Sequence, residues 1–320
     1  MKFSDFKKVK VLVIGDVILD KYIIGEVTRI SPEAPVPVLN ITDRKHTLGG
    51  AGNVAYNVKK LGCNVELFGY RGSDTNGLIL SDFIKENNIG ENLYILEDYP
   101  TICKTRILAN RQQLLRIDDE KIIENSQIQI KQLISNINLK LDNVDVVILS
   151  DYSKGVLTGD IVQQIITKCK DKKILVFVDP KWHTWLRFKG ATCLTPNLNE
   201  LEKYIGKRLT KKTEIVEAGT KILKDLELQC ILITLGAEGM CLINNDLEYK
   251  FITSTAREVF DVSGAGDTVI SCLATIYAFS NNFELSSKIA NYAAGIVVGK
   301  IGSQPILLEE IEQALKTEFN

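Results

Sequence analysis

Short runs of aliphatic and β-branched residues recur along this sequence, and helix-length amphipathic segments separate most of them. The runs lie at about 9–14, 65–69, 144–149, 174–178, 192–194 and 230–234. Most of them end directly in polar or turn residues, as a buried parallel strand does where its carboxyl end opens into a site. The pattern predicts a three-layer α/β fold with a mostly parallel central sheet and ligands at its carboxyl edge.

Two stretches interrupt this alternation. Residues 17–48 contain strand-like pieces with no helix between them, and a polar, hairpin-like stretch runs from about 94 to 118. Strands joined without a crossover helix usually pair antiparallel. We therefore expect a small antiparallel β-sheet lid with one apolar face. It is inserted into a single domain covering residues 1–320, since no repeat or linker divides the chain.

Residues 261–268 (Asp-Val-Ser-Gly-Ala-Gly-Asp-Thr) precede an apolar run of helical length. Gly264, Ala265 and Gly266 are expected to form the turn that opens a helix, with unpaired N–H groups that bind an anion. Asp267 is then either a first-turn acid stabilised by the helix dipole or a base that deprotonates a hydroxyl attacking a bound phosphate. We favour the second interpretation, because the first does not explain the two glycines that flank Ala265.

Composition restricts the class of protein. The chain has 320 residues, of which 45% are hydrophobic and 25% charged, and its net charge is −1. These values are ordinary for a globular enzyme and provide no global field for nucleic acid or an anionic membrane. The N-terminus lacks the apolar core of a signal peptide, and no run approaches the ~18 apolar residues of a membrane span. We expect a cytoplasmic protein with neither a nucleic-acid partner nor a membrane partner.

The seven cysteines form no Cys-x-x-Cys pair and are odd in number. Reduced, buried thiols are expected, with neither a disulfide nor a structural zinc. The two histidines, His46 and His183, are far apart and have polar neighbours. A surface or structural role is expected for each.

Two further features concern ligands. Residues 49–53 (Gly-Gly-Ala-Gly-Asn) lead into a helical pattern that ends near Gly62, and glycines there let a ligand approach the backbone closely. Four cations, Lys104, Arg106, Arg111 and Arg116, are spread along the second lid stretch. By default they form a solvated face. Alternatively, the first three clamp a substrate phosphate and Arg116 serves the fold through Asp118.

Three familiar motifs of nucleotide-binding proteins are absent from the sequence. It contains no Gly-x-x-x-x-Gly-Lys-Ser/Thr loop, no Gly-x-Gly-x-x-Gly after the first strand and no His-Arg-Asp catalytic loop. Residues 49–53 together with residues 261–268 instead resemble the two signatures of the ribokinase-like (PfkB) carbohydrate kinases. Residues 15–20, 29–38, 112–118 and 149–155 look like those of the D-glycero-β-D-manno-heptose-7-phosphate kinases, which make the 1,7-bisphosphate on the route to ADP-heptose and the lipopolysaccharide inner core. The resemblance covers nearly the whole chain.

The resemblance implies a ribokinase-like fold and a role for each matched residue. Asp267 matches the catalytic base, and Gly264, Ala265 and Gly266 match the anion hole. ATP and Mg²⁺ are implied as cofactors, with Glu200 holding Mg²⁺ through water. The implied nucleotide positions are Asn197, Leu198, Asn199, Glu200, Thr234, Gly236 and Asn291, and we expect Lys181 to join them. The implied sugar positions are Asp16, Asp20, Gly49, Gly50 and Asn53. We also expect Asp151 to bind the sugar. If the sugar carries a remote phosphate, Lys104, Arg106 and Arg111 are the nearest cations in sequence that could offset the cost of desolvating it.

Three expectations qualify this picture. The helix dipole should lower the basicity of Asp267, which a loose phosphoryl-transfer transition state tolerates. The protein should form a homodimer through the lid, because so small a sheet needs another surface to cover its apolar face. Many bacterial relatives carry a second, nucleotidyltransferase domain with a His-x-Gly-His motif. This sequence ends at Asn320 without one, so we expect only the kinase half of the activity.

Two other functions remain open from the sequence. A ribokinase-like kinase for another sugar, sugar phosphate or nucleoside would use the same motifs and differ in its sugar pocket. A non-catalytic sugar-binding protein on this fold is the other possibility. Such a protein would be expected to lose Asp267 or the glycines before it, and this chain keeps them.

Overall fold

The computed structural model describes residues 8–109, 112–124, 126–181, 184–256, 259–300, 302 and 304–318. A nine-stranded sheet in the order β13-β12-β11-β10-β9-β8-β1-β4-β5 forms its centre. Its strands are β1 (Lys10–Gly15), β4 (Asn64–Gly72), β5 (Gly90–Leu96), β8 (Val146–Ser150), β9 (Leu175–Asp179), β10 (Cys193–Leu194), β11 (Cys230–Thr234), β12 (Met240–Asn244) and β13 (Tyr249–Ile252). The strands from β11 to β5 pair in parallel. At the other edge of the sheet, β12 pairs antiparallel with both β11 and β13.

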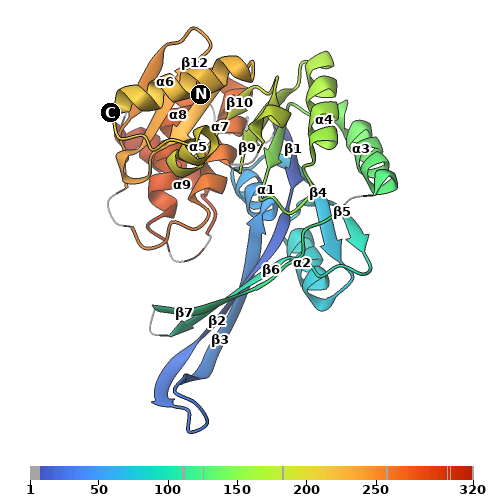
Figure 1. Ribbon diagram of the computed structural model, residues 1–320, viewed down its shortest axis with the longest axis vertical. Helices are drawn as coiled ribbons and strands as arrows, with labels where there is room; N and C mark the ends of the chain where they lie inside the picture. The colour runs from blue at the N-terminus through green and yellow to red at the C-terminus, as the bar shows by residue number, and fades with distance from the viewer. Residues whose placement is uncertain are drawn as a thin grey trace.

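Helices cover both faces of this sheet (Figure 1). They are α1 (Ala51–Lys60), α2 (Thr75–Glu86), α3 (Gln127–Leu141), α4 (Gly159–Asp171), α5 (Leu198–Ile205), α6 (Lys212–Asp225), α7 (Ala265–Ser280), α8 (Phe283–Val297), α9 (Leu308–Glu318) and the short 3₁₀ turns η2 (Trp185–Phe188) and η3 (Gly236–Glu238). Side chains alternate along β1, so Val11 and Val13 pack with α1, α7 and α8, whereas Leu12 and Ile14 pack with α3 and α4. The predicted three-layer architecture is confirmed.

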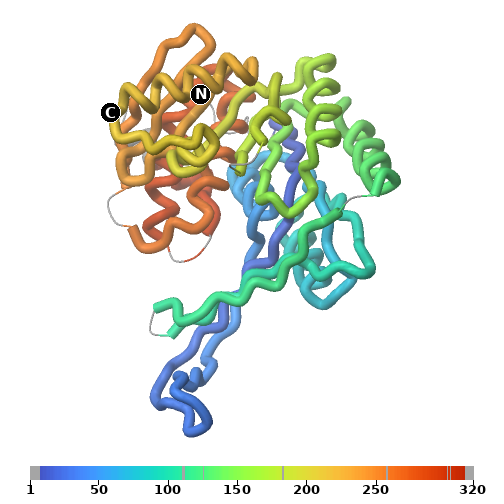
Figure 2. Tube along the Cα trace, in the orientation of Figure 1, coloured from blue at the N-terminus to red at the C-terminus, as the bar shows by residue number. Residues whose placement is uncertain are grey.

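The second sheet has the strand order β3-β2-β6-β7 and stands apart from the main one. It consists of β2 (Val17–Ile30), β3 (Pro37–Gly50), β6 (Cys103–Ala109) and β7 (Gln112–Asp119). The long β2–β3 arms run side by side away from the body of the molecule (Figure 2). We call this sheet the lid. Two details of the prediction are wrong: β2 and β6 pair in parallel, and residues 94–96 belong to β5 of the main sheet.

The two faces of the lid differ in polarity. Strand register places Asp20 beside Lys104, and Tyr22 beside Arg106, on one face. The opposite face carries Ile23, Ile107, Leu115 and Ile117, of which Leu115 and Ile117 are 54% and 49% exposed. The expected apolar face is therefore present and extends along the exposed edge strand β7.

Several features outside the site agree with the sequence. All seven cysteines are buried and unbridged. His46 is exposed on β3 and its ring contacts Phe83 at 5.9 Å between centroids, whereas His183 lies outside the described residues. Among the helices of the described ranges, none has the length and apolarity needed to cross a membrane.

The junction between β1 and β8 is tightly packed, since a Cβ added to Gly15 would lie 2.0 Å from the carbonyl oxygen of Ser150. We predict that Gly15→Ala lowers the free energy of unfolding by roughly 1–3 kcal/mol, a usual cost of overpacking. Gly159→Ala is the matched control, because a Cβ added to Gly159, at the start of α4, would meet no neighbouring part of the described structure within 4 Å. That variant should gain about 0.4–1 kcal/mol. Urea unfolding measures both, and equal stability of the two variants would contradict this packing.

Candidate active site at the carboxyl edge of the sheet

Helix α7 begins as the glycine pattern predicted. Gly264 takes the left-handed conformation, with φ of +80°, and serves as the N-cap. The expectation that the whole turn is unpaired is wrong in one respect, because the Ala265 N–H donates to the carbonyl of Val262 at 3.3 Å. The N–H of the exposed Gly266 has no acceptor among the described residues. The helix terminus therefore offers a free amide and its dipole to an anion.

Asp267 is buried in the first turn of α7 and both of its carboxylate oxygens are partnered. Oδ2 accepts from Nδ2 of Asn53 at 2.7 Å, and Oδ1 accepts from the hydroxyl of Tyr152 at 2.8 Å. Burial raises the pKa of Asp267 to about 6, although these two hydrogen bonds and Lys181 lower it. The sequence-based expectation of weakened basicity is wrong, because desolvation outweighs the groups that stabilise the carboxylate.

Asp16 follows β1 and is fully buried, but its carboxylate is used by the protein itself. It accepts the backbone N–H groups of Tyr152, Lys154 and Val156 at 2.9, 3.0 and 3.1 Å. Burial raises the pKa of Asp16 to about 6, while these donors lower it. We therefore assign Asp16 to the loop after β8, which it holds in place, in addition to any contact with sugar.

Asp20 and the glycines before α1 lie together at the base of the lid. A Cβ on Gly49 would lie 2.5 Å from Oδ2 of Asp20, so only glycine fits beside this carboxylate. Gly50 is the N-cap of α1 with φ of +57°, a conformation that favours glycine. Asn53 lies in the first turn of α1, so this corner of the fold aims Asn53 at Asp267. The structure thus brings together most of the predicted sugar positions.

The predicted phosphate clamp is not preformed. Arg106 pairs with Asp20 at 2.5 Å, and Lys104 pairs with both Asp118 and Glu120 at 2.9 Å. Arg111 lies outside the described residues. Arg116 donates to both oxygens of Asp118 at 2.9 and 3.0 Å, as its structural interpretation required. Lys104 and Arg106 do share the polar face of the lid, but carboxylates already neutralise them.

Several of the residues that are expected to bind the nucleotide lie at the start of α5. Asn197 caps this helix by accepting the Glu200 N–H at 2.9 Å, and Oε2 of Glu200 accepts the Asn197 N–H at 3.0 Å. This is a capping box, which the Asn-x-x-Glu spacing alone could have predicted. The second oxygen of Glu200 pairs with Nζ of Lys181 at 3.1 Å. The same element therefore starts a helix and presents a Lys–Glu pair at the carboxyl end of β9.

The other expected nucleotide residues have mixed surroundings. Thr234 forms a bridge with Asn197, and Gly236 is exposed with φ of +60°. Leu198 packs against the core and Asn199 is exposed on α5. Asn291, on α8, donates to the carbonyl of Thr253 at 2.8 Å. Leu198 is thus explained by packing alone.

Asp151 is placed in an ion pair rather than at an open sugar position. Its carboxylate pairs with Arg187, and it also accepts the Ser153 N–H at 2.9 Å. The side chain is buried. The pair ties the loop after β8 to η2, which carries Arg187. Removing one partner of such a buried pair is costly, so we assign Asp151 a structural role.

Two residues of the site were not predicted from the sequence. Tyr152 donates to Asp267 across 115 positions of the chain, and no local pattern signals such a contact. Asp179 ends β9, where its polar character after an apolar strand could have identified it. Burial and then Glu200 raise the pKa of Asp179 well above its usual value, while Lys181 lowers it. These groups extend the site toward Lys181 and Glu200.

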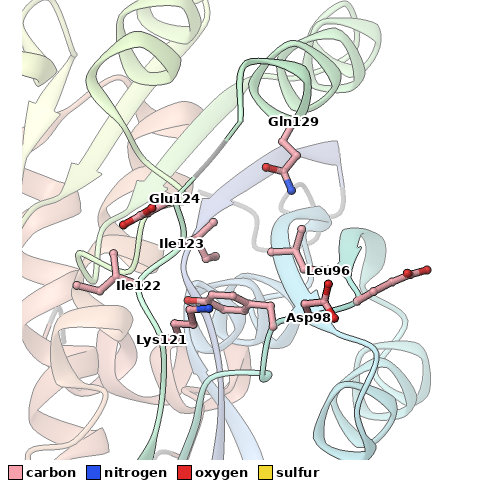
Figure 3. A pocket seen from close by; sticks show the side chains of 9 residues that line it. Leu96, Asp98, Lys121, Ile122, Ile123, Glu124 and Gln129 are labelled. Carbon is pink, nitrogen blue, oxygen red and sulfur yellow. The ribbon is translucent and has the colours of Figure 1, made fainter.

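A separate cavity of about 380 Å³ lies at the root of the lid (Figure 3). Residues 96–99 form one wall and residues 121–124 the other. The first segment leads from β5 of the main sheet toward β6 of the lid, and the second leads from β7 of the lid toward α3. Neither Asp267 nor its partners Asn53 and Tyr152 line the cavity.

Comparisons with known proteins agree with this geometry. The chain is 44% identical over 312 residues to the bifunctional protein HldE of Haemophilus influenzae strain Rd, covering 98% of this chain and 64% of that protein. It is 42% identical to the protein of the same name from Pasteurella multocida, over 99% of this chain and 66% of that one. The chain therefore spans slightly less than two thirds of the length of these relatives.

Solved structures with this fold are more distant in sequence. Phosphofructokinase-2 from Escherichia coli superposes with a TM-score of 0.80 at 16% identity, over 98% of this chain and 99% of that one. Arabidopsis thaliana ribokinase, solved with ribose and ATP, gives 0.74 at 19% identity, over 96% and 98%. The sequence profile of the pfkB family carbohydrate kinases matches residues 8–310. With that match, and with the glycine-opened helix α7 that carries Asp267, this chain belongs to the pfkB family of carbohydrate kinases.

Proposed function

We propose that this protein transfers the γ-phosphoryl group of ATP to the anomeric hydroxyl of D-glycero-β-D-manno-heptose 7-phosphate, giving the 1,7-bisphosphate used in ADP-heptose synthesis. The observation that carries the phosphoryl transfer is the position of Asp267, a buried carboxylate in the first turn of a helix that a left-handed glycine opens. The choice of sugar is supported by the resemblance of residues 15–20, 29–38, 112–118 and 149–155 to the heptose-7-phosphate kinases. It is also supported by the 44% identity to HldE.

In this proposal the residues of the chain divide the work. Asp267 accepts the proton of the sugar hydroxyl, and its pKa of about 6 makes it ionised and moderately basic near neutral pH. The free amide of Gly266 and the α7 dipole stabilise the charge of the transferring phosphoryl group. Asn53 fixes one oxygen of Asp267, and Asp20, which we propose binds the sugar, is close enough to raise the pKa of Asp267. Position and electrostatics, more than base strength, then lower the barrier.

Membership of a kinase family implies the use of ATP, and we propose Mg²⁺ as its companion ion. The carboxylate of Glu200 fits the metal, and the ammonium of Lys181, paired with it at the carboxyl end of the sheet, fits the nucleotide phosphates. Both oxygens of Glu200 already accept hydrogen bonds, so a contact through water suits it better than direct ligation. The bound ion would neutralise charge on the nucleotide phosphates.

A second candidate function is phosphorylation of a sugar that carries no phosphate. One observation favours it: Lys104 and Arg106, the cations expected to meet a substrate phosphate, are already paired with carboxylates. A dianion entering this site would have to share Arg106 with Asp20. Arg106 has five donors and only one of them is used in that pair, so sharing is chemically reasonable.

We also propose a cytoplasmic homodimer that assembles through the lid. Seven buried, unbridged thiols suit a reducing compartment. The apolar face of the lid and its exposed edge strand β7 are the surface that a second copy would cover.

Asp267→Asn tests the chemistry. The variant should fold and bind ATP but lose roughly 10²–10⁴-fold in turnover, because the amide keeps the shape and removes the proton acceptor. ADP release with heptose 7-phosphate and ATP measures the turnover. Asp142→Asn is the matched control, since Asp142 is an exposed residue after α3 that pairs with Lys172. An Asp267→Asn enzyme within about threefold of wild type would refute the assignment.

Arg106→Ala tests the substrate phosphate. The Michaelis constant for heptose 7-phosphate should rise roughly 10- to 100-fold, which corresponds to the loss of one hydrogen bond to a charged group. The Michaelis constant for ATP should change little. Loss of the Asp20 pair should affect unphosphorylated heptose as well, but by less. Arg116→Ala provides the control, because Arg116 shares that face of the lid yet is 51% exposed and bound to Asp118. Equal effects of Arg106→Ala on both sugars would support the second candidate function instead.

Sedimentation velocity at micromolar protein tests the assembly. Wild type should sediment as a dimer, and Ile117→Lys should weaken the dimer by placing a charge on the apolar face of the lid. Leu139→Lys, at a residue of α3 that is 74% exposed, should leave the dimer intact. A wild-type monomer at every concentration would contradict the proposed interface.

A further inference from the structure

Tyr152 lies in the loop after β8 and donates a hydrogen bond to Asp267. It therefore reaches this carboxylate from a part of the chain other than α7 and the glycine-rich start of α1. Its hydroxyl donates to Oδ1 of Asp267 at 2.8 Å, and its backbone N–H donates to Oδ2 of Asp16 at 2.9 Å. Two aspartates therefore hold this residue at both ends. We propose that Tyr152 is a positioning residue, whose hydroxyl keeps the Asp267 carboxylate oriented and ionised for proton acceptance. The proposal rests on the proposed function of Asp267 as the base.

The geometry assigns one donor to each oxygen of the carboxylate. Asn53 takes Oδ2 and Tyr152 takes Oδ1, so rotation of the carboxylate about its last bond would break both hydrogen bonds. Each carboxylate oxygen can accept a second hydrogen bond. A substrate hydroxyl can therefore bind Asp267 while both protein donors stay in place, and the base needs no rearrangement before proton transfer.

The scaffold, rather than a ligand, determines the position of Tyr152. Asp16 accepts the N–H groups of Lys154 and Val156 as well, which fixes the part of the loop that follows the tyrosine. Nζ of Lys181 lies 4.8 Å from the centre of the Tyr152 ring, a cation–π contact that the Lys181–Glu200 pair holds in place. The phenol is thus preorganised by contacts within the protein itself.

The same loop connects the base to the lid. Lys154 pairs with Glu120 at 2.6 Å, and the other oxygen of Glu120 pairs with Lys104 of β6 at 2.9 Å. Gly155 has φ of +107°, and a Cβ there would lie 2.2 Å from the carbonyl of Ile123. Close packing and ion pairs therefore join the segment after β7 to the loop that carries Tyr152.

The charged groups around Asp267 explain why the donor matters. Asp179 at the end of β9, Lys181 just after β9 and Asp20 on β2 face the carboxylate, and Tyr152 and Asn53 donate to it. Burial raises the pKa of Asp267, and the two hydrogen bonds oppose that rise. Burial and then Asp267 raise the pKa of Tyr152 well above its usual value, so the phenol stays protonated and acts only as a donor. Removal of its hydroxyl should raise the pKa of Asp267 further.

Titration of the Asp267 carboxyl carbon by ¹³C NMR, in ligand-free protein with labelled aspartate, tests the proposal directly. The Asp267→Asn variant assigns the resonance. Wild type should titrate near pH 6, and Tyr152→Phe should shift this midpoint upward by about one pH unit. Tyr70→Phe is the matched control, because it removes a buried hydroxyl for which the described residues provide no hydrogen-bond partner.

Kinetics supply the second readout. The acid limb of kcat/KM should move to higher pH in Tyr152→Phe by the same amount as the NMR midpoint, while the melting temperatures of both phenylalanine variants stay close to that of wild type. The titration of the sugar phosphate is common to all variants and cancels in this comparison. A purely structural role of Tyr152 would lower stability without moving either midpoint.

The outcomes separate this proposal from the function on which it rests. An unchanged NMR midpoint in Tyr152→Phe would overturn the proposal. A shifted midpoint with an unmoved acid limb would overturn both, because Asp267 would then not be the base. If wild type phosphorylated none of the sugars tested, the proposed function would fail, while the NMR titration, which needs no sugar, would still decide whether Tyr152 controls Asp267.

Discussion

A carboxylate cannot stay ionised inside a protein unless nearby groups replace the water it has lost, and the site described above is built around that requirement at Asp267. Its replacements come from three parts of the chain: Asn53 at the start of α1, Tyr152 in the loop after β8, and the terminus of α7 itself. Their convergence needs the parallel sheet, whose carboxyl edge brings these connections to one place. Incomplete compensation leaves the pKa of Asp267 at about 6.

A second buried aspartate provides the support for this arrangement. Asp16 uses its carboxylate to bind three backbone donors of the loop after β8 and so fixes the tyrosine that reaches Asp267. The loop in turn meets the lid through Lys154 and Glu120. A movement of the lid against the main sheet would therefore act on the loop that positions Asp267, the proposed base.

The fold was largely predictable because its signals are local. Apolar runs that end in polar residues identified β1, β8, β9 and β11, and the glycines before Asp267 identified the start of α7. The parallel pairing of β2 with β6 was not predictable, since it depends on residues far apart in sequence. The same reason explains the roles missed for Asp16, Asp151, Lys104 and Tyr152, whose partners are distant in the chain. The capping box of Asn197 and Glu200 is the exception, as its spacing was visible in the sequence.

The central claim is that this site phosphorylates the anomeric hydroxyl of a sugar that already carries a remote phosphate. The most direct measurement is ADP release across a panel of sugars and sugar phosphates, with the product examined by ³¹P NMR. The account predicts the highest kcat/KM for D-glycero-β-D-manno-heptose 7-phosphate and a new phosphate resonance coupled to the anomeric proton. A clear preference for an unphosphorylated sugar, or a new phosphate at another carbon, would contradict it.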